Sequence, residues 1–186
     1  MIDYKNADKA TLKAEYKRLS RETHNLPFFT RKEFYALPEI LGDEETPVAI
    51  TSGMMNDHTW LIVLTNRRIL FLDKGMLFGG KQVIISLADI TAIQGSTGLI
   101  YGEITISTAG QKHEISHIYK KAVNSFIQMT DKERDQYRSD PIQKIKPFHQ
   151  NTSDKVTQLE KLAALKNQGI LTEEEFEKEK RRILAL

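Results

Sequence analysis

The pattern of apolar and polar residues divides the chain into a helical start, a β-rich middle and a helical end. Residues 8–20 contain good helix formers, and their apolar stripe places Leu12, Tyr16 and Leu19 four and three residues apart. This spacing puts the three side chains on one face and is typical of an amphipathic helix. The stripe is sparse, so we expect this helix to pack against a neighbouring domain.

A second helical segment is expected at residues 30–41. Thr30 and Glu33 stand at the spacing of a capping box, in which each side chain satisfies a backbone amide at the start of a helix. Phe34, Leu37 and Leu41 mark its apolar face, and a proline at position 38 is expected to end or kink the helix near residue 42.

Seven short runs rich in β-branched and aromatic residues follow. They cover residues 48–51, 59–65, 68–72, 82–86, 90–94, 101–108 and 111–115. Turn residues separate them at 55–57 and 66–67, and Thr108-Ala109-Gly110 is a hairpin signal. A helix from about residue 118, with apolar residues at helical spacing, must then cover an apolar opening. Strands in such close succession favour a small antiparallel barrel or sandwich.

The end of the chain is helical again. Pro141 and Pro147 lie in a mixed stretch that is typical of a linker, residues 139–154. Beyond it, residues 156–167 form one amphipathic helix, and a second begins at a capping box of Thr172 and Glu175. Overall the sequence predicts an α+β fold. Its parts are a helical segment (1–41), a seven-stranded barrel with a C-terminal capping helix (42–138), the linker (139–154) and a small helical hairpin (155–186).

Composition narrows the function. The 186 residues carry a formal charge of only +2, without the strongly basic footprint of a dedicated nucleic-acid binder. There is no cysteine, which excludes disulfides and thiolate chemistry and favours a reducing compartment, the cytoplasm. No signal peptide or membrane span is expected, and no small-molecule substrate or cofactor is evident.

Two motifs imitate enzyme sites. His113, Glu114 and His117 satisfy the H-E-x-x-H pattern of zinc proteases, which requires a helix. If residues 111–115 form a strand, histidines four apart lie about 13 Å from each other, too far to share a metal ion. Residues 75–81 match Walker A spacing as far as Lys81, but Gln82 replaces the magnesium-binding hydroxyl and a strand follows. We therefore predict no metal site and no enzyme, with a zinc hydrolase as the least favoured alternative.

Two stretches resemble known families. Residues 60–71 and 86–93 are similar to strand regions of the bacterial PH-like families, the YokE-like group especially. Residues 159–184 closely resemble the short C-terminal (SHOCT) domain. The resemblance implies a pleckstrin-homology-like barrel and a role in protein contact and oligomerisation. It does not carry over lipid binding, because the first hairpin loop, residues 54–58, has no lysine or arginine.

The predicted function is a non-catalytic module for protein–protein contact, including contact between copies of the chain. A hairpin of about 30 residues is too small to bury its own apolar face. The candidate interface comprises an apolar loop tip and that face: Met76, Leu77, Phe78, Leu159, Leu162, Leu165, Phe176 and Ile183. The alternative is a peripheral binder of membranes or nucleic acid that uses Lys144, Lys146 and the basic residues of 178–182.

Overall fold

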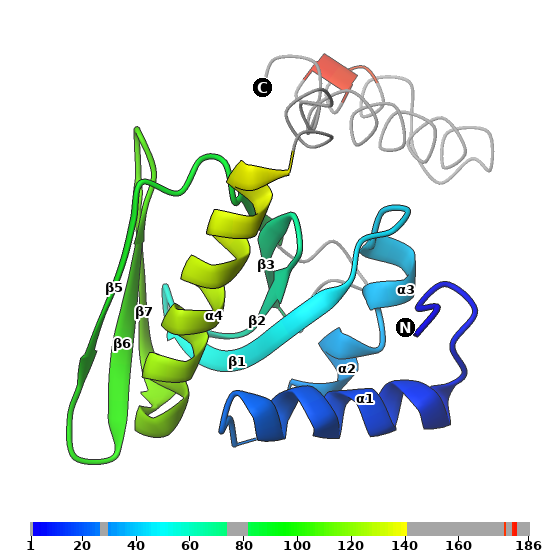
Figure 1. The fold of residues 1–186 in the computed structure, drawn as a ribbon, viewed down its shortest axis with the longest axis horizontal. Helices are drawn as coiled ribbons and strands as arrows, with labels where there is room; N and C mark the ends of the chain where they lie inside the picture. Colours follow the sequence, from blue (N-terminus) through cyan, green and yellow to red (C-terminus); the bar gives the residue numbers. More distant parts are fainter. Residues whose placement is uncertain (1, 27–29, 74–81, 141–176, 178–179, 182–186) are drawn as a thin grey trace. The chain divides into compact units, whose positions relative to one another are not determined.

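The structure is a computed structural model that describes residues 2–26, 30–73, 82–140, 177, 180 and 181. Residues 1–144 form one compact unit and residues 145–186 a second. The predicted α+β fold is confirmed, with helices before and after a seven-stranded antiparallel sheet (Figure 1). The elements of the first unit are α1 (Lys9–Glu22), α2 (Arg31–Phe34), α3 (Leu37–Ile40), β1 (Pro47–Met55), β2 (His58–Thr65), β3 (Arg68–Asp73), β4 (Gln82–Ser86), β5 (Ala92–Thr97), β6 (Tyr101–Ser107), β7 (Lys112–Tyr119) and α4 (Lys120–Ser139).

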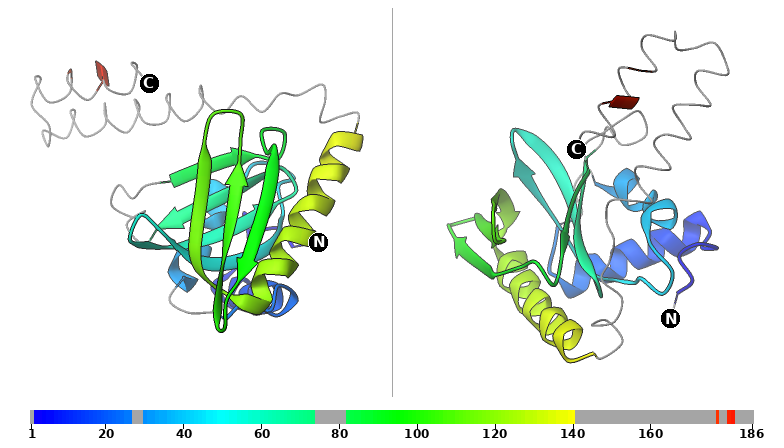
Figure 2. Two further views of the ribbon diagram at one scale, coloured as in Figure 1. Left: turned by 90° about the vertical axis from the view of Figure 1, so that its left-hand side faces the viewer. Right: turned by 90° about the horizontal axis from the view of Figure 1, so that it is seen from above.

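The strands follow the order β4-β3-β2-β1-β7-β6-β5, and neighbours in this order are antiparallel. Tight turns set most of the register, as expected. Asn56 and Asp57 have φ of 52° and 62°, which suits the two-residue turn between β1 and β2. Between β1 and β7, Met54 and Ser116 are the paired positions. Figure 2 shows β5, β6 and β7 crossing in front of β1–β4, so the two groups of strands enclose a core.

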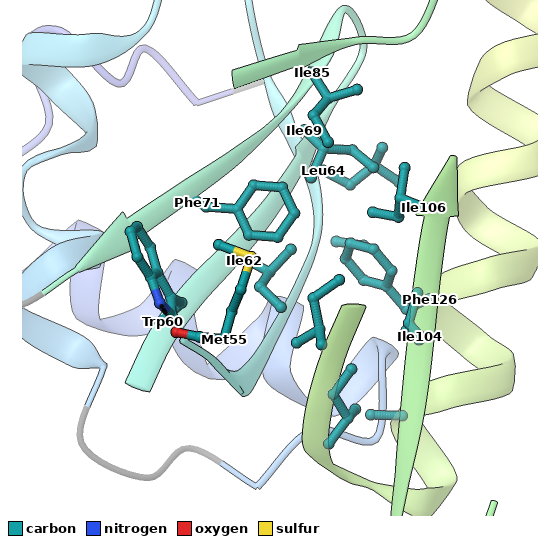
Figure 3. Close-up of a cluster of buried hydrophobic side chains, with 14 of the residues drawn as sticks. Met55, Trp60, Ile62, Leu64, Ile69, Phe71, Ile85, Ile104, Ile106 and Phe126 are labelled. Atoms are coloured by element: carbon teal, nitrogen blue, oxygen red, sulfur yellow. Dashed lines mark hydrogen bonds between the residues drawn. The ribbon is translucent and has the colours of Figure 1, made fainter. Parts of the chain in front are cut away.

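The main core fills the space between the two groups of strands and α4 (Figure 3). Strands β2 and β3 contribute alternate side chains, among them Trp60, Ile62 and Phe71, and β6 contributes Ile104 and Ile106 in the same way. Helix α4 closes this core with Ala122, Val123 and Phe126. The predicted capping helix is therefore confirmed.

Two glycines allow backbones to approach closely in this core. A Cβ on Gly53 would lie 2.5 Å from Ile115 Cγ2, where β1 meets β7. A Cβ on Gly95 would lie 2.6 Å from both Val123 Cγ1 and Ile127 Cδ1, where α4 packs on β5. Any larger residue at these two positions forces the side chains or backbone in contact with it to move.

A second core lies on the other face of β1–β3. Helix α1 packs Leu12, Tyr16 and Leu19 against this face, together with Phe34 and Leu37 from the short helices. Strand β2 is therefore covered on both sides, which explains why residues 60–65 form an unbroken buried run instead of an alternating one. The expectation that the N-terminal helices support a neighbouring domain is confirmed.

Three local predictions were wrong. The segment 30–41 forms two short helices instead of one. Thr30 makes no side-chain capping bond, because its Oγ1 lies within hydrogen-bond distance of Tyr16 Oη (3.1 Å) and Ser52 Oγ (3.0 Å). Strand β7 continues to Tyr119, since Tyr119 and Ile118 pair with β6, so α4 begins later than its apolar pattern indicated. Strand β5 starts at Ala92, two residues later than expected.

Candidate binding surface

The meeting point of β1 and β7 shapes the surface at one end of the sheet. The Ser116 hydroxyl donates to Met54 O at 3.4 Å, and the next residue, His117, has a φ of 56°. Such a left-handed residue is uncommon in a strand and turns the side chain away from its regular position. The His117 ring lies beside Tyr101, with 5.8 Å between ring centroids.

A groove of about 430 Å³ opens beside this pair of rings. Its walls come from the segment that follows α1, from β1 and β2, and from β6 and β7. The lining residues are Asn25, Leu26, Ser52, Gly53, Met54, Thr59, Tyr101, His117 and Tyr119. None of them is Asp, Glu, Lys or Arg, so the groove offers aromatic and apolar contact with a few neutral polar groups. This lining is typical of sites that bind uncharged or apolar side chains.

The exposed large hydrophobic residues of the described part gather next to the groove. Leu99 is 85% exposed, Ile100 55% and Tyr101 52%, all at the β5–β6 turn, and Leu26 is 40% exposed. Tyr101 and Leu26 line the groove themselves. Ile100 O accepts a hydrogen bond from Lys120 N at 3.1 Å, which holds the turn beside Tyr119. We call Leu26, Leu99, Ile100, Tyr101 and the groove the apolar surface.

A larger hollow of about 660 Å³ lies on the other side of His117 and has a different character. Its charged side chains are Asp57, Glu103, Glu114 and Lys112, so acids outnumber bases. An anionic ligand such as a phosphate would be repelled there. The β1–β2 turn has no basic residue, and the hollow beside it has more acidic than basic side chains. Both observations argue against anion binding at this end of the sheet.

The H-E-x-x-H residues lie on strand β7, as expected, and not on a helix. His113 pairs with Ile106 and Glu114 with Thr105 across β6. The His113 ring stacks on Phe71 at 6.2 Å between centroids, and burial lowers the pKa of His113 below its usual value. Within the described residues, no three His, Cys, Asp or Glu side chains are grouped so that they could hold a metal ion. The arrangement does not support a zinc site.

The interface residues predicted from the sequence lie outside the part of the chain that the structure describes. Met76, Leu77 and Phe78 lie outside the described residues, as do Leu159, Leu162, Leu165, Phe176 and Ile183, and the Walker-like stretch 75–81. These positions stay a prediction. The sequence reasoning missed Leu99 and Ile100, although they had a signal: two apolar residues stand in a turn between Gly98 and Gly102. In the part of the chain that the structure covers, no helix is long and apolar enough to cross a bilayer.

Comparison with known proteins finds two matching families and similar solved structures. Residues 41–132 match the family described as bacterial PH domain, and residues 157–184 match the short C-terminal domain. One similar solved structure is a pleckstrin homology domain from Shewanella amazonensis SB2B, with 24% identity over 43% of this chain and 75% of that chain and a TM-score of 0.32. Another is a DUF1696 family protein with a pleckstrin-homology domain from Shewanella loihica PV-4, with 23% identity over 53% and 87% and a TM-score of 0.35. No relative was found among curated proteins.

Domains of the two matched types are generally interaction or binding modules and are typically non-catalytic. The matched range 41–132 contains all seven strands and the first part of α4, which agrees with the sheet order and the closing helix described above. Residues 41–132 of this chain are a bacterial PH domain, and a short C-terminal domain follows at residues 157–184.

Proposed function

We propose that this chain is a non-catalytic module that binds another protein through the apolar surface, and that copies of the chain associate with one another in this way. One observation carries the proposal: of the four exposed large hydrophobic residues in the described part, two line a groove that has no Asp, Glu, Lys or Arg, and the other two directly precede Tyr101 of its lining. Scattered single apolar residues are normal on a protein surface, whereas a cluster beside a groove is typical of an interaction site.

The energetics favour contact with a protein. Burying a leucine or isoleucine side chain completely contributes about 1.5–3 kcal/mol. Leu99 and Ile100 are largely exposed, so a partner that covers them gains most of this free energy. The groove contains no formal charge, so covering it requires no desolvation of an ion. Tyr101 adds a large, rigid side chain with a hydroxyl, the type of residue that often dominates interface energetics.

The short C-terminal domain is proposed to act in the same way. Its apolar positions Leu159, Leu162, Leu165, Phe176 and Ile183 belong to a unit of about 30 residues, which is too small to bury them alone. The loop residues Met76, Leu77 and Phe78 stay a third proposed contact. A location in the cytoplasm stays a prediction from the lack of cysteine.

The test is the mass of the full-length chain in solution, measured by light scattering during size exclusion over a range of concentrations. We expect the wild type to exceed the monomer mass of 21.3 kDa, and Leu99→Ser/Ile100→Ser to return towards it. Because both side chains are exposed, the double change should alter the free energy of unfolding by no more than about 0.5 kcal/mol per site.

A matched control separates the apolar surface from general surface change. Ala10 and Ala14 are exposed on α1, far along the chain from the β5–β6 turn, and Ala10→Ser/Ala14→Ser should leave the mass unchanged. Leu159→Ser/Leu162→Ser tests the contribution of the short C-terminal domain in the same assay. A wild-type chain that stays at 21.3 kDa up to high concentration would show that self-association is wrong.

A further inference from the structure

A row of basic residues runs along the exposed side of α1. Lys9, Lys13, Lys17 and Arg21 stand four residues apart, and all four are exposed. Residues at this spacing are neighbours on successive turns, so they form one continuous stripe. The twelve steps along the chain from Lys9 to Arg21 span about 18 Å at the rise of an α-helix.

The short helix α2 widens this stripe into a face. Lys9 Nζ lies 5.8 Å from the centroid of the Tyr35 ring, which follows α2 directly, so the first residue of the stripe contacts the end of α2. Helix α2 carries two more exposed cations, Arg31 and Lys32. We call these residues the basic face: Lys9, Lys13, Lys17, Arg21, Arg31 and Lys32.

The cations of the basic face have no ion-pair partner within the residues that the structure describes. Arg18, on another side of the same helix, differs from them. Its Nη2 lies 2.6 Å from Glu15 Oε1 and its Nη1 lies 2.7 Å from Glu22 Oε1. Arg18 thus forms ion pairs with two acids of its own helix, whereas the cations of the stripe form none among the described residues.

The stripe does not stabilise the helix that carries it. Like charges four residues apart repel one another and destabilise a helix, and the stripe contains three such pairs in sequence. Its first member, Lys9, stands in the first turn, where the helix dipole disfavours a cation and where no acid is present. The helix is held instead by its buried side, with Leu12, Tyr16 and Leu19 in the second core. An anionic partner would relieve the repulsion between the cations.

The surroundings of the stripe favour a protein over a lipid or a nucleic acid. Helix α1 exposes no large apolar residue, and its apolar side is already buried in the second core, so it cannot insert into a bilayer surface. The formal charge of +2 for the whole chain is too small to draw a nucleic acid from a distance. Steps of about 6 Å along the stripe match carboxylates four residues apart on another helix.

We propose that the basic face binds an acidic helical segment of a partner protein, in which glutamates or aspartates recur every four residues. This inference rests on the proposed function, because it names the chemistry of a protein partner. The contact is electrostatic and complements the apolar surface, which is formed by other elements of the unit.

The test uses the full-length chain and a fluorescent, capped peptide of repeated Glu-Ala-Ala-Ala units, with a Gln-Ala-Ala-Ala peptide for comparison. We expect the dissociation constant of the glutamate peptide to rise with salt, since exposed charge contacts are screened. Lys13→Glu/Lys17→Glu should weaken binding by about tenfold or more, because two attractive contacts become repulsive. Lys112→Glu/Lys132→Glu removes the same charge at exposed positions elsewhere and should leave binding within about twofold.

Other outcomes would overturn the inference. Equal binding by the two double variants would show that only net charge matters. Tighter binding of an oligothymidylate or of phosphatidylglycerol vesicles than of the glutamate peptide would assign the face to nucleic acid or lipid instead. The two proposals can fail separately. If the glutamate peptide does not bind but self-association is still reduced by Leu99→Ser/Ile100→Ser, the acidic partner is refuted and the proposed role of the apolar surface stands.

Discussion

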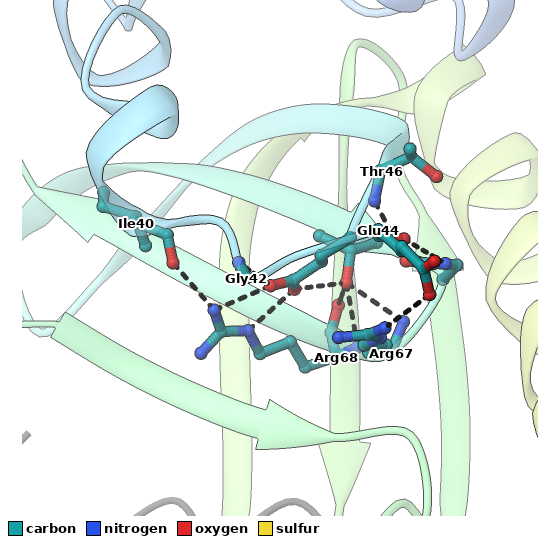
Figure 4. A network of polar contacts seen from close by, with 9 residues as sticks. Ile40, Gly42, Glu44, Thr46, Arg67 and Arg68 are labelled. Carbon is teal, nitrogen blue, oxygen red and sulfur yellow. Dashed lines mark hydrogen bonds and ion pairs between the residues drawn. The ribbon is translucent and has the colours of Figure 1, made fainter. Parts of the chain in front are cut away.

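Arg68 and Glu45 form a buried ion pair that ties the third strand to the segment leading into the first. Arg68 Nε donates to Glu45 Oε1 at 2.8 Å, and Nη2 donates to Oε2 at 2.9 Å. The same guanidinium donates to Ile40 O, and the carboxylate accepts from Gly42 N (Figure 4). Side-chain exposure is 7% for Arg68 and 0% for Glu45. The pair thus joins the N-terminal helices to the sheet through one desolvated contact.

Breaking this pair from one side should be costly. Arg68→Met leaves the Glu45 carboxylate buried without its cation, and we expect the free energy of unfolding to fall by about 3–5 kcal/mol. Urea denaturation at pH 7, followed by fluorescence, measures the change.

Two comparisons separate the buried charge from simple loss of contact. Glu45→Met/Arg68→Met removes both charges and should recover much of the loss, because an apolar pair requires no desolvation. Lys5→Ala breaks the pair between Lys5 and Asp43, whose side chains are 53% and 89% exposed, and should cost less than about 1 kcal/mol. If Arg68→Met costs no more than Lys5→Ala, the buried pair is not a main link between helices and sheet.

The same carboxylate predicts a dependence on pH. Burial alone would raise the pKa of Glu45, but the hydrogen bonds and the charge of Arg68, with further donation from Gly42 and Thr65, outweigh burial and lower it. A carboxyl whose pKa is lower in the folded than in the unfolded chain contributes stability that is present above its unfolded pKa, about 4.3. That contribution is lost as the pH falls through the folded pKa.

A comparison of the wild type with Glu45→Gln isolates this effect. At pH 7 the wild type should be the more stable, and the difference in free energy of unfolding should shrink below about pH 4 as Glu45 is protonated. Other carboxyl groups titrate equally in both proteins and cancel in the difference. A difference that stays constant from pH 7 to pH 3 would contradict the assignment.

Local patterns predicted the elements well because each element satisfies its own rule. Leu12, Tyr16 and Leu19 lie on the buried side of α1, and the Thr108-Ala109-Gly110 turn joins β6 to β7 as expected. Predictions failed where a distant contact decided the outcome. Threonine is a suitable residue to cap a helix, but the Thr30 hydroxyl forms hydrogen bonds with the hydroxyls of Tyr16 and of Ser52 in β1 instead. No local pattern contains that information.

The candidate site was harder to predict than the fold. Leu99 and Ile100 are an ordinary apolar pair in the sequence, and only the register of β5 on β6 places them in an exposed turn. The groove beside them is assembled from four strands and the segment after α1, and its lining includes the left-handed residue His117. A site built from residues far apart in the chain leaves no motif, whereas the complete H-E-x-x-H motif proved to be part of a strand.

Gly95 should be among the least replaceable residues of the sheet. A methyl group there would lie 2.6 Å from side-chain atoms of Val123 and Ile127, so either these side chains or α4 must move away from β5. We expect Gly95→Ala to lower the free energy of unfolding by about 1–3 kcal/mol through this overpacking. Gly110→Ala is the control, because nothing lies within 4 Å of its added methyl group, and it should change stability by about 0.5 kcal/mol or less. Equal midpoints in urea for the two variants would show that α4 yields without cost.

The N-terminal helices should unfold together with the PH domain, because they share the strands β1–β3 with the main core. Leu19 is fully buried against these strands, and Leu19→Ala should lower the free energy of unfolding by about 2–5 kcal/mol. Trp60, the single tryptophan, lies in the main core on the other face of the sheet and reports on that side alone.

Trp60 fluorescence therefore decides whether the two cores form one cooperative unit. If they do, Leu19→Ala lowers the urea midpoint of the Trp60 signal by the amount that corresponds to the full decrease in the free energy of unfolding, although the substitution changes only the second core. Lys13→Ala, an exposed change on the same helix, should leave the midpoint nearly unchanged. An unchanged Trp60 transition in Leu19→Ala would instead mean that the helices detach separately and leave one face of β1–β3 uncovered. In that case the sheet would stay folded although the helices no longer cover the buried residues of β2, and the helices would have to be treated as a separate domain.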